Sequence, residues 1–295
     1  MRIAFTVVAQ DFDSLQDALT PALDAVIAVG RPVSDTAGLG EAAMDIFVDG
    51  ADIGALRVAA RRAFERKRVD FCVQPAAGRR KRLLIADMDS TIISCECLDE
   101  LADFAGVKPQ VAAITERAMA GEIPFEAALR ERVAMLKGLS LSKLQETYDQ
   151  RVKLTPGAAT LAKTMAAHGA TCLLVSGGFE FFTERVSQAA GFSGHKANRM
   201  VDDGQVLTGE VTDPILGREA KLETLRAYAS DLGIDLAATL AVGDGANDLA
   251  MIEAAGLGVA YRAKPIVAAQ AAAQVNHTDL TSLLFFQGYG ADEFA

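Results

Sequence analysis

Short apolar runs that each end at a chemically active residue constrain the fold of this chain more than any other feature. The runs and the residues that follow them are Leu83–Ala86 with Asp87, Cys172–Val175 with Ser176, and Leu240–Val242 with Gly243-Asp244. Apolar runs without polar alternation are typical of strands in a parallel sheet that helices cover on both faces. Helical patterns lie between them, at Ala158–His168 and Leu222–Leu232. We therefore predict an α/β fold with a doubly wound parallel sheet.

A long insert separates the first two predicted strands. It runs from Leu98 to about Arg151 and contains helical patterns at Phe125–Leu136 and Ser142–Tyr148. Because the insert starts just after a strand end, we expect a helical cap at about 98–151 that lies over that end as a lid.

The first 75 residues follow a different pattern. Their predicted elements have the order βαββαβ, which is the split arrangement of ferredoxin-like α+β modules. Pro21 predicts a kink or a second start in the first helix. The segment 76–82 contains Gly and a basic run, which predicts an exposed linker. We therefore divide the 295 residues into an α+β domain at 1–75, a linker at 76–82 and an α/β domain at 83–295.

The charge balance limits the partners of the chain. It has 29 Lys+Arg against 39 Asp+Glu, a formal net charge of −10 that repels nucleic acid. The same charge repels a phosphorylated ligand, so a phosphate site needs local positive charge from a metal or a dedicated Lys or Arg. The four cysteines form no CxxC pair, and we expect reduced thiols. The chain has no apolar run of the roughly 20 residues that a membrane span needs and no signal-peptide pattern, which predicts a cytoplasmic protein without a membrane partner.

The predicted strand ends gather oxygen ligands. In an open parallel sheet, ligands bind beyond the carboxyl ends of the strands. These ends carry Asp87 and Asp89, Ser176, and Asp244 and Asp248. Crowded carboxylates raise one another's pKa unless a cation compensates, and Mg²⁺ prefers oxygen ligands while it keeps places for water and phosphate. We predict Asp87 and Asp244 as carboxylate ligands of Mg²⁺, with Asp89 adding its backbone carbonyl.

The same residues suit phosphoryl transfer. The carboxylate of Asp87 could attack phosphorus, and Asp89 could protonate the leaving oxygen and then activate water. Ser176 and the two glycine amides after it, which we expect at a helix start, could hold phosphate oxygens. Lys221 could neutralise charge on the transferring group. Each motif alone has an ordinary structural explanation as a turn or a surface residue, so the interpretation depends on their order along the chain.

In that order, four motifs resemble those of the haloacid dehalogenase superfamily phosphatases. They are Asp87-Met88-Asp89-Ser90-Thr91, Ser176-Gly177-Gly178, Lys221 and Gly243-Asp244-Gly245-Ala246-Asn247-Asp248. The resemblance covers about residues 83–285. It implies a doubly wound sheet with a helical cap and the activity of a Mg²⁺-dependent phosphomonoesterase.

The resemblance also implies roles for single residues. Asp87 becomes the nucleophile and Asp89 the acid/base, which follows the family pattern of the first motif. Ser176 and Lys221 become ligands of the phosphoryl group. The acidic residues of the last motif, Asp244 with Asp248 in support, become holders of Mg²⁺.

Further stretches resemble the phosphoserine phosphatase branch of that superfamily: Glu96, Phe125–Val133 and Ser176-Gly177-Gly178-Phe179. The branch hydrolyses O-phospho-L-serine to L-serine and phosphate through an aspartyl-phosphate, the last step of serine biosynthesis. The resemblance implies that Glu96 faces the amino group of the substrate and that Arg132 pairs with its carboxylate. It also implies substrate contacts from Gly177 and Asn247.

Charge complementarity agrees with an amino-acid substrate, because a carboxylate matches the ammonium and a forked guanidinium matches the carboxylate. Met119 and Phe125 could add apolar walls. The alternatives are that Glu96 is only a charge at a helix N-terminus and that Arg132 lies on a solvated helix face. Two other functions also stay open: a phosphatase or phosphotransferase for another small ester, and a non-catalytic amino-acid-binding protein.

The N-terminal unit resembles the ACT-like modules that precede some phosphoserine phosphatase domains. The resemblance rests on the order of its elements. Such a module could pair two copies of the chain into a homodimer, or stabilise the fold, or bind serine.

Overall fold

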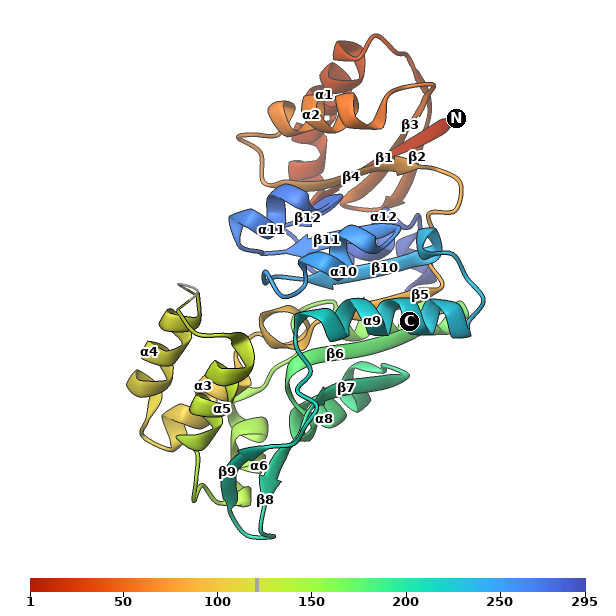
Figure 1. Ribbon diagram of the computed structural model, residues 1–295. Helices are drawn as coiled ribbons and strands as arrows, with labels where there is room; N and C mark the ends of the chain where they lie inside the picture. The colour runs from red at the N-terminus through yellow and green to blue at the C-terminus, as the bar shows by residue number, and fades with distance from the viewer. Residues whose placement is uncertain (120–121) are drawn as a thin grey trace.

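The computed structural model describes residues 1–119 and 122–295, without the side chain of Met119. One ten-stranded sheet runs through the molecule, with the strand order β2-β3-β1-β4-β12-β11-β10-β5-β6-β7. Figure 1 shows the N-terminal unit at one end of this sheet and the helices of the insert beside the opposite half.

The N-terminal unit has the predicted order βαββαβ. Its elements are β1 (Arg2–Ala9), α1 (Phe12–Ala28), β2 (Val33–Gly40), β3 (Ala43–Asp49), α2 (Ile53–Ala63) and β4 (Val69–Pro75). The strands pair antiparallel, β1 with both β3 and β4, and β3 with β2. Two helices cover one face of this sheet, where Phe5, Leu15 and Leu56 belong to one buried apolar cluster.

The first helix does not break at Pro21, so our expectation of a second start there is wrong. α1 is continuous over 17 residues with Pro21 inside it. Its buried residues Leu15, Ala18, Ala22, Ala25 and Val26 recur at helical spacing on both sides of the proline. Burial of this stripe against the sheet stabilises the helix and offsets the hydrogen bond that proline cannot make.

The second half of the chain forms the doubly wound parallel sheet that we predicted. Its strands are β5 (Leu83–Ala86), β6 (Thr171–Phe179), β7 (Gly194–Asn198), β10 (Thr239–Gly243), β11 (Leu257–Tyr261) and β12 (Ala273–Val275). Its helices are α7 (Ala158–Ala167), α8 (Glu180–Ala190), α9 (Arg218–Asp231), α10 (Leu249–Ala254), α11 (Pro265–Gln270) and α12 (Ser282–Phe286). β5 pairs in parallel with β10 on one side and β6 on the other, so their carboxyl ends face the same edge of the sheet.

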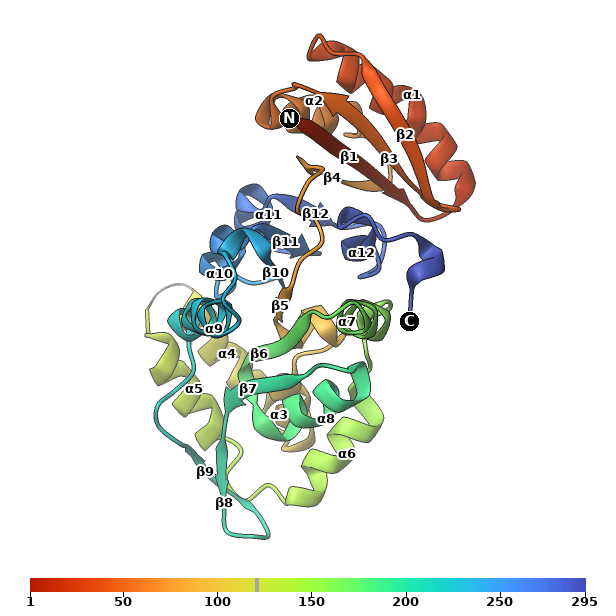
Figure 2. The same cartoon turned by 90° about the vertical axis from the view of Figure 1, so that its right-hand side faces the viewer.

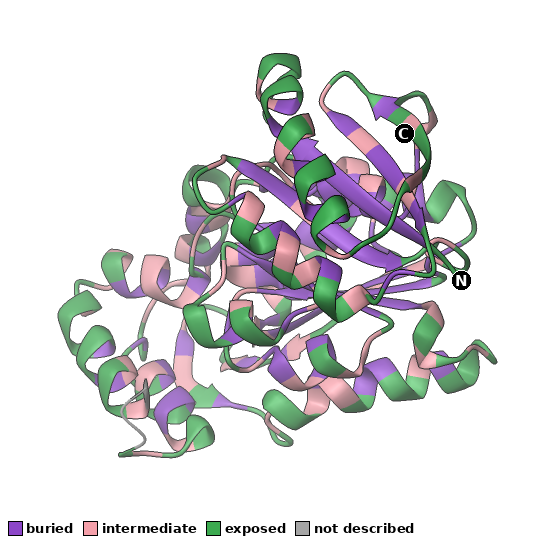
Figure 3. Cartoon of the chain, turned by 90° about the horizontal axis from the view of Figure 1, so that it is seen from above, coloured by how far each residue is buried: buried purple, intermediate pink, exposed green. Residues whose placement is uncertain are grey.

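Successive residues of each central strand enter different cores, as strand geometry requires. Leu83 and Ile85 of β5 pack into a cluster with residues of α9, α10 and α11, such as Leu225. Leu84 and Ala86 pack into a second cluster with residues of α7, α8 and α12, such as Leu161. Figure 2 shows these two groups of helices on opposite sides of the sheet, and Figure 3 shows that the strands between them are buried. The continuous apolar runs in the sequence therefore reflect burial on both faces.

The insert consists of helices α3 (Cys97–Phe104), α4 (Lys108–Met119), α5 (Phe125–Ala134) and α6 (Leu141–Arg151). A two-stranded antiparallel hairpin, β8 (Met200–Asp202) with β9 (Leu207–Val211), packs beside it, which the sequence did not predict. The backbone N–H of Gly138 donates to Leu207 O at 2.8 Å, and Leu207 N–H donates to Leu139 O at 2.9 Å. The hairpin therefore supports the far end of the helical insert.

The two halves of the chain are joined through the sheet. β4 of the N-terminal unit pairs antiparallel with β12, where Phe71 is opposite Gln274. The buried carboxylate of Asp70 accepts hydrogen bonds from the backbone N–H groups of Asn276, His277 and Thr278, at 2.8 to 3.3 Å. The carboxylate of Asp70 thus accepts hydrogen bonds from donors that follow β12, about 200 residues later in the chain. The contact between the two halves of the chain is therefore specific.

The segment at 76–82 is held in place, and our expectation of an exposed segment is wrong for two of its basic residues. Arg79 forms an ion pair at 2.6 Å with Asp45 of β3, whose side chain is fully buried. Lys81 is buried, and its ammonium donates to Ala237 O at 2.8 Å and to Gly78 O at 3.1 Å. The basic run therefore ties the N-terminal unit to the α/β half.

Among the described residues, no helix is both long enough and apolar enough to cross a membrane.

Candidate active site

A cavity of about 310 Å³ lies between the carboxyl ends of the parallel strands and the helical insert. Its strand-end walls come from Asp87, Asp89, Ser176, Gly177, Gly178, Phe179, Asp244, Gly245 and Asn247. Its insert walls come from Leu98, Asp99, Thr115, Phe125, Leu129 and Arg132, with Glu96 and Lys264 also lining it. One cavity thus collects nearly all of the residues that the sequence singled out.

Asp87 and Asp89 follow β5 on a tight turn. Asp87 is anchored to the neighbouring strand, because its N–H donates to Val242 O at 3.0 Å. In the turn Met88–Ile92, Ser90 has a φ of 55°, a left-handed conformation that turns the chain sharply. The carboxylate of Asp89 accepts from the N–H of Cys97 at 2.9 Å and from the hydroxyl of Ser176 at 3.3 Å. The two carboxylates therefore face different parts of the cavity.

Lys221 of α9 is buried between two carboxylates. Its ammonium lies 2.7 Å from Asp87 Oδ1 and 2.5 Å from Asp248 Oδ1, and all three side chains are at most 7% exposed. Burial alone would lower the pKa of Lys221, but the charges of Asp248 and Asp87 outweigh burial and raise it. Burial and the charge of Asp248 raise the pKa of Asp87, against the opposing effect of Lys221. One ammonium is thus too little positive charge for this group of acids.

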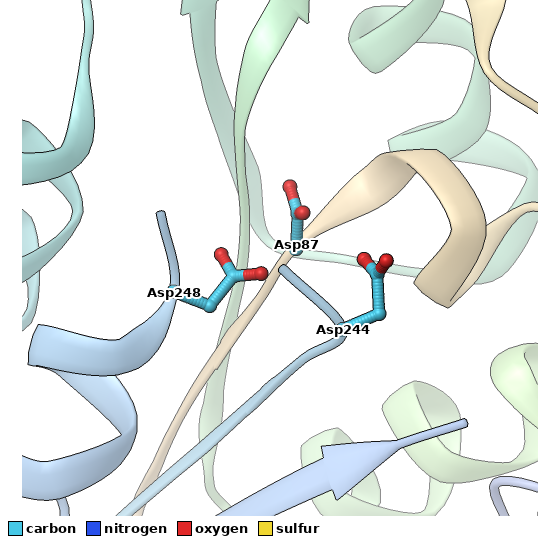
Figure 4. Close-up of side chains that lie close together, drawn as sticks. All are labelled: Asp87, Asp244 and Asp248. Carbon is cyan, nitrogen blue, oxygen red and sulfur yellow. The ribbon is translucent and has the colours of Figure 1, made fainter. Parts of the chain in front are cut away.

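The carboxylates of Asp87, Asp244 and Asp248 converge, as Figure 4 shows. Each offers one oxygen, and these oxygens lie within 4.8 Å of one another. Burial and the charge of Asp248 also raise the pKa of Asp244. An all-oxygen cluster that is short of positive charge fits a hard divalent cation.

The cluster differs in one respect from the predicted ligand set. Asp248, which we assigned only a supporting role, contributes a carboxylate to it. The side chain of Asp89 points to Cys97 and Ser176. Only the backbone carbonyl of Asp89 is thus left as its candidate ligand atom. Burial raises the pKa of Asp89, although the hydrogen bonds from Cys97 and Ser176 and the charge of Lys221 oppose the shift.

The Ser-Gly-Gly motif lies within β6, and only Phe179 separates it from α8, which begins at Glu180. The amides of Gly177 and Gly178 therefore precede the helix, instead of standing in its first turn. The N–H of Gly178 donates to Ser176 Oγ at 2.9 Å, and Asn198 Nδ2 of β7 donates to Gly177 O at 2.8 Å. The same buried Asn198 also bonds both backbone groups of Leu216, just before α9. A side chain missed by the sequence prediction thus holds the motif in place.

Glu96 directly precedes α3, but its side chain makes no capping bond to that helix. Its carboxylate instead accepts from the hydroxyl of Ser90 at 2.6 Å. Although much of the residue is exposed at the rim, burial of its carboxyl end together with the charge of Asp89 raises the pKa of Glu96 to about 7. The alternative that Glu96 serves only as a helix N-terminal charge therefore loses support.

Arg132 and Phe125 of α5 contribute a charged and an apolar side chain to the cavity wall, and Asn247 also lines the cavity. Arg132 is half-buried in α5, which does not fit the alternative of a solvated helix face. Burial lowers the pKa of its guanidinium, and the charges of Asp99 and Glu96 oppose the shift. Phe125 lies against the phosphate motif, since a Cβ on Gly177 would be 3.4 Å from its ring. The side chain of Met119, the other predicted apolar wall, lies outside the described residues.

Sequence reasoning missed several residues that line the cavity or contact its acidic cluster. Thr91 donates from Oγ1 to Asp244 Oδ1 at 3.3 Å, and Asp99, Thr115 and Lys264 line the cavity. Thr91 stands inside the first motif and Asp99 three residues after Glu96, so their positions offered a signal. Thr115 and Lys264 come near the site only through helix packing and a loop after β11, which no local pattern indicates.

Known proteins match most of the chain. The haloacid dehalogenase-like hydrolase family matches residues 84–253. The phosphoserine phosphatase of Polaromonas sp. is 46% identical over 208 residues, which are 69% of this chain and 88% of that protein.

Solved structures resemble both halves of the molecule. A HAD family hydrolase from Salmonella enterica serovar Typhi has a TM-score of 0.85 at 32% identity, over 98% of this chain and 99% of its own. A phospho-aspartyl intermediate analogue of phosphoserine phosphatase has a TM-score of 0.64 at 40% identity, over 70% of this chain and 98% of its own. The first of these matches extends over the N-terminal unit, whereas the second covers a smaller share of the chain.

Proposed function

This chain belongs to the haloacid dehalogenase-like hydrolases and, within them, to the phosphoserine phosphatases, and we propose from this membership that it hydrolyses O-phospho-L-serine to L-serine and phosphate. The reaction is a phosphomonoester hydrolysis and the last step of serine biosynthesis. The observation that carries the proposal is one cavity with two ends. Asp87 lies at its inner end, with the buried Lys221 paired to it, and Glu96 and Arg132 lie toward the insert. This arrangement suits a substrate with a phosphate at one end and an amino acid at the other.

The family is metal-dependent, and we assign Mg²⁺ to the carboxylate cluster. Asp87 and Asp244 would hold it, with Asp248 in support and Asp89 adding its backbone carbonyl. When bound, the ion supplies positive charge that neutralises these acids and polarises the phosphoryl oxygens.

Asp87 is the assigned nucleophile. Its Oδ1 accepts from Met88 N–H at 2.8 Å and lies against Lys221, so among the described residues Oδ2 has no hydrogen bond. We assign Oδ2 as the atom that attacks phosphorus, which forms the aspartyl-phosphate while the bond from phosphorus to the seryl oxygen breaks. Lys221 then stabilises negative charge on the transferring group.

Asp89 is the assigned acid and base. Its raised pKa favours the protonated form, which can give its proton to the departing seryl oxygen. The resulting carboxylate then takes a proton from water, whose oxygen attacks phosphorus and releases phosphate with Asp87 restored. The hydroxyl of Ser176 donates to the carboxylate of Asp89, so both side chains lie beside the proposed position of the phosphoryl group. We assign Ser176 and the amide of Gly177 to its oxygens.

The amino-acid end of the substrate faces Glu96 and Arg132. We assign the ammonium to the carboxylate of Glu96 and the carboxylate to the guanidinium of Arg132. Asn247 lines the cavity after the last motif, and we assign it a further substrate contact.

The N-terminal unit is proposed as an ACT-like domain at 1–75, joined by the segment 76–82 to the phosphatase domain at 83–295. The β4 edge of its sheet is occupied by β12, whereas β2 is the last strand at the other end. Beside this end, Phe12, Leu23 and Ile27 of α1 are 41–70% exposed. We propose that this side pairs two copies of the chain. Sedimentation of Ile27→Glu against the unchanged protein tests the homodimer, and a cytoplasmic location stays a prediction.

Phosphate release tests the proposed activity. The purified protein should release phosphate from O-phospho-L-serine with Mg²⁺ and stop when a chelator is added. Asp87→Asn should remain folded by circular dichroism and release none. Turnover of other phosphomonoesters without turnover of O-phospho-L-serine would refute the substrate.

A further inference from the structure

The guanidinium of Arg132 is held by two hydrogen bonds within the insert. Its Nε donates to Ala128 O, one helical turn earlier in α5, at 3.2 Å. Its Nη1 donates to the hydroxyl oxygen of Thr115 in α4 at 3.4 Å. One bond comes from its own helix and the other from a neighbouring helix, so the plane of the guanidinium depends on how α4 packs against α5.

The hydroxyl of Thr115 is oriented to receive this donor. Its single proton is engaged, because Oγ1 donates to Val111 O at 3.1 Å in the preceding turn of α4. The remaining lone pairs of Oγ1 can only accept. Thr115 also lines the cavity, so it meets Arg132 at the wall of the substrate site.

These two bonds determine which edge of the guanidinium is free. A carboxylate can pair with two donors, either Nε with Nη2 or Nη1 with Nη2. Ala128 O occupies Nε and so blocks the first pair, and Thr115 takes one of the two protons on Nη1. The other Nη1 proton and both Nη2 protons remain, so Nη1 with Nη2, the outer edge of the fork, is the pair that a carboxylate can use.

This outer edge has no carboxylate partner among the described residues, since no ion pair of Arg132 falls within 4.0 Å there. Asp99 and Glu96 are the acidic groups whose charges act on Arg132, and both line the same cavity. An oriented cation with an unclaimed pair of donors is thus available to an incoming anion.

We propose that Thr115 is a positioning residue, which holds the Arg132 guanidinium so that the substrate carboxylate binds end-on to Nη1 and Nη2. The inference rests on the proposed function, and it adds a residue that touches Arg132 without taking part in the chemistry. A guanidinium that is already oriented loses less freedom when the substrate binds, so the entropic cost of binding is lower. The benefit extends only to ligands with a carboxylate.

Thr115→Val tests this inference, because valine keeps the shape of threonine and removes the acceptor. The measurements are KM and kcat for O-phospho-L-serine, and the inhibition constant of inorganic phosphate, the product that has no carboxylate. We expect KM to rise about fivefold, as suits the loss of one hydrogen bond from a charged group at a half-buried site. The inhibition constant and kcat should change little, and Thr115→Ser should restore KM.

Thr147→Val is the matched control. Thr147 of α6 makes the same kind of bond within the insert, from its hydroxyl to Lys143 O at 2.7 Å, but it does not line the cavity. If Thr147→Val raises KM as much as Thr115→Val, or if Thr115→Val weakens phosphate and O-phospho-L-serine equally, the positioning role is wrong. A protein that shows no turnover of O-phospho-L-serine before any substitution would instead overturn the proposed function.

Discussion

Gly178→Ala should lower kcat by crowding Asp89, without unfolding the protein. A Cβ built on Gly178 would lie 2.7 Å from Asp89 Oδ2, 3.1 Å from Ser176 Oγ and 3.5 Å from Met88 Cε. Non-bonded heavy atoms prefer separations of about 3.5 Å, so the carboxylate must move by about half an ångström or more. Asp89 cannot swing freely, because the N–H of Cys97 holds its other oxygen at 2.9 Å.

The expected loss follows from where Asp89 has to be. Misplacement of a catalytic group by about 1 Å can cost about a hundredfold in rate, so a shift of half that size predicts a loss of about tenfold in kcat. KM should change less, because the groups assigned to the serine end of the substrate do not touch Gly178. The thermal unfolding midpoint should stay close to that of the unchanged protein, since the strain falls on one side chain.

Steady-state hydrolysis of O-phospho-L-serine with Mg²⁺ measures this effect. Gly38→Ala is the matched control, because a Cβ at Gly38 would meet no heavy atom within 4 Å and its φ is not in the left-handed region. It should leave kcat unchanged. If Gly178→Ala folds and turns over at the unchanged rate, then Asp89 is not placed as the acid and base.

Three further substitutions test other parts of the site. Arg132→Ala should reduce kcat/KM for O-phospho-L-serine more than for p-nitrophenyl phosphate, which has no carboxylate; equal losses on both esters would contradict the assigned role. The pKa of Glu96 is raised to about 7 from 4.5, so the folded state keeps this proton longer than the unfolded chain does, and stability falls as pH rises between these values. Glu96→Gln should therefore reduce the loss of unfolding free energy over this pH range, as measured by urea titration. It should also flatten the rise of kcat/KM near pH 7. Unchanged pH profiles would refute the raised pKa of Glu96. Lys221→Met leaves buried carboxylates unpaired and should cost about 3 kcal/mol of unfolding free energy at pH 8 without metal, and less at pH 5, where the acids take up protons; a denaturation midpoint equal to that of the unchanged protein at pH 8 would show that the ion pairs do not stabilise the fold.

The sequence predicted the parts of the fold that local pattern determines. The apolar run Leu83–Ala86 is a strand because both of its faces are buried, and a motif that follows such a run must appear at the carboxyl edge of the sheet. This rule places Asp87 and Asp244 at the same edge of the sheet, and they lie near each other because β5 and β10 are parallel neighbours. The family resemblance then added Glu96 and Arg132, which chain spacing could not bring together.

Long-range packing was beyond the sequence. β12 has three residues, and its antiparallel pairing with β4 depends on Asp70 and a loop more than 200 residues away. The composition of the basic run at 79–82 predicted an exposed linker. The ion pair of Arg79 with a buried carboxylate forms only in the folded molecule, so composition could not predict it. Likewise, Thr115 and Asn198 act through hydrogen bonds between elements, and their surroundings in the chain carry no mark of the site.

We propose that Asp87 carries the phosphoryl group during turnover of phosphoserine. The most direct test is to quench the protein in acid during hydrolysis of O-phospho-L-serine with Mg²⁺, reduce with borohydride, and sequence the peptides by mass spectrometry. Reduction converts an aspartyl-phosphate to homoserine, so we expect homoserine at position 87, and only when substrate is present. Phosphate release with position 87 unmodified, or with the label at another carboxylate, would contradict it.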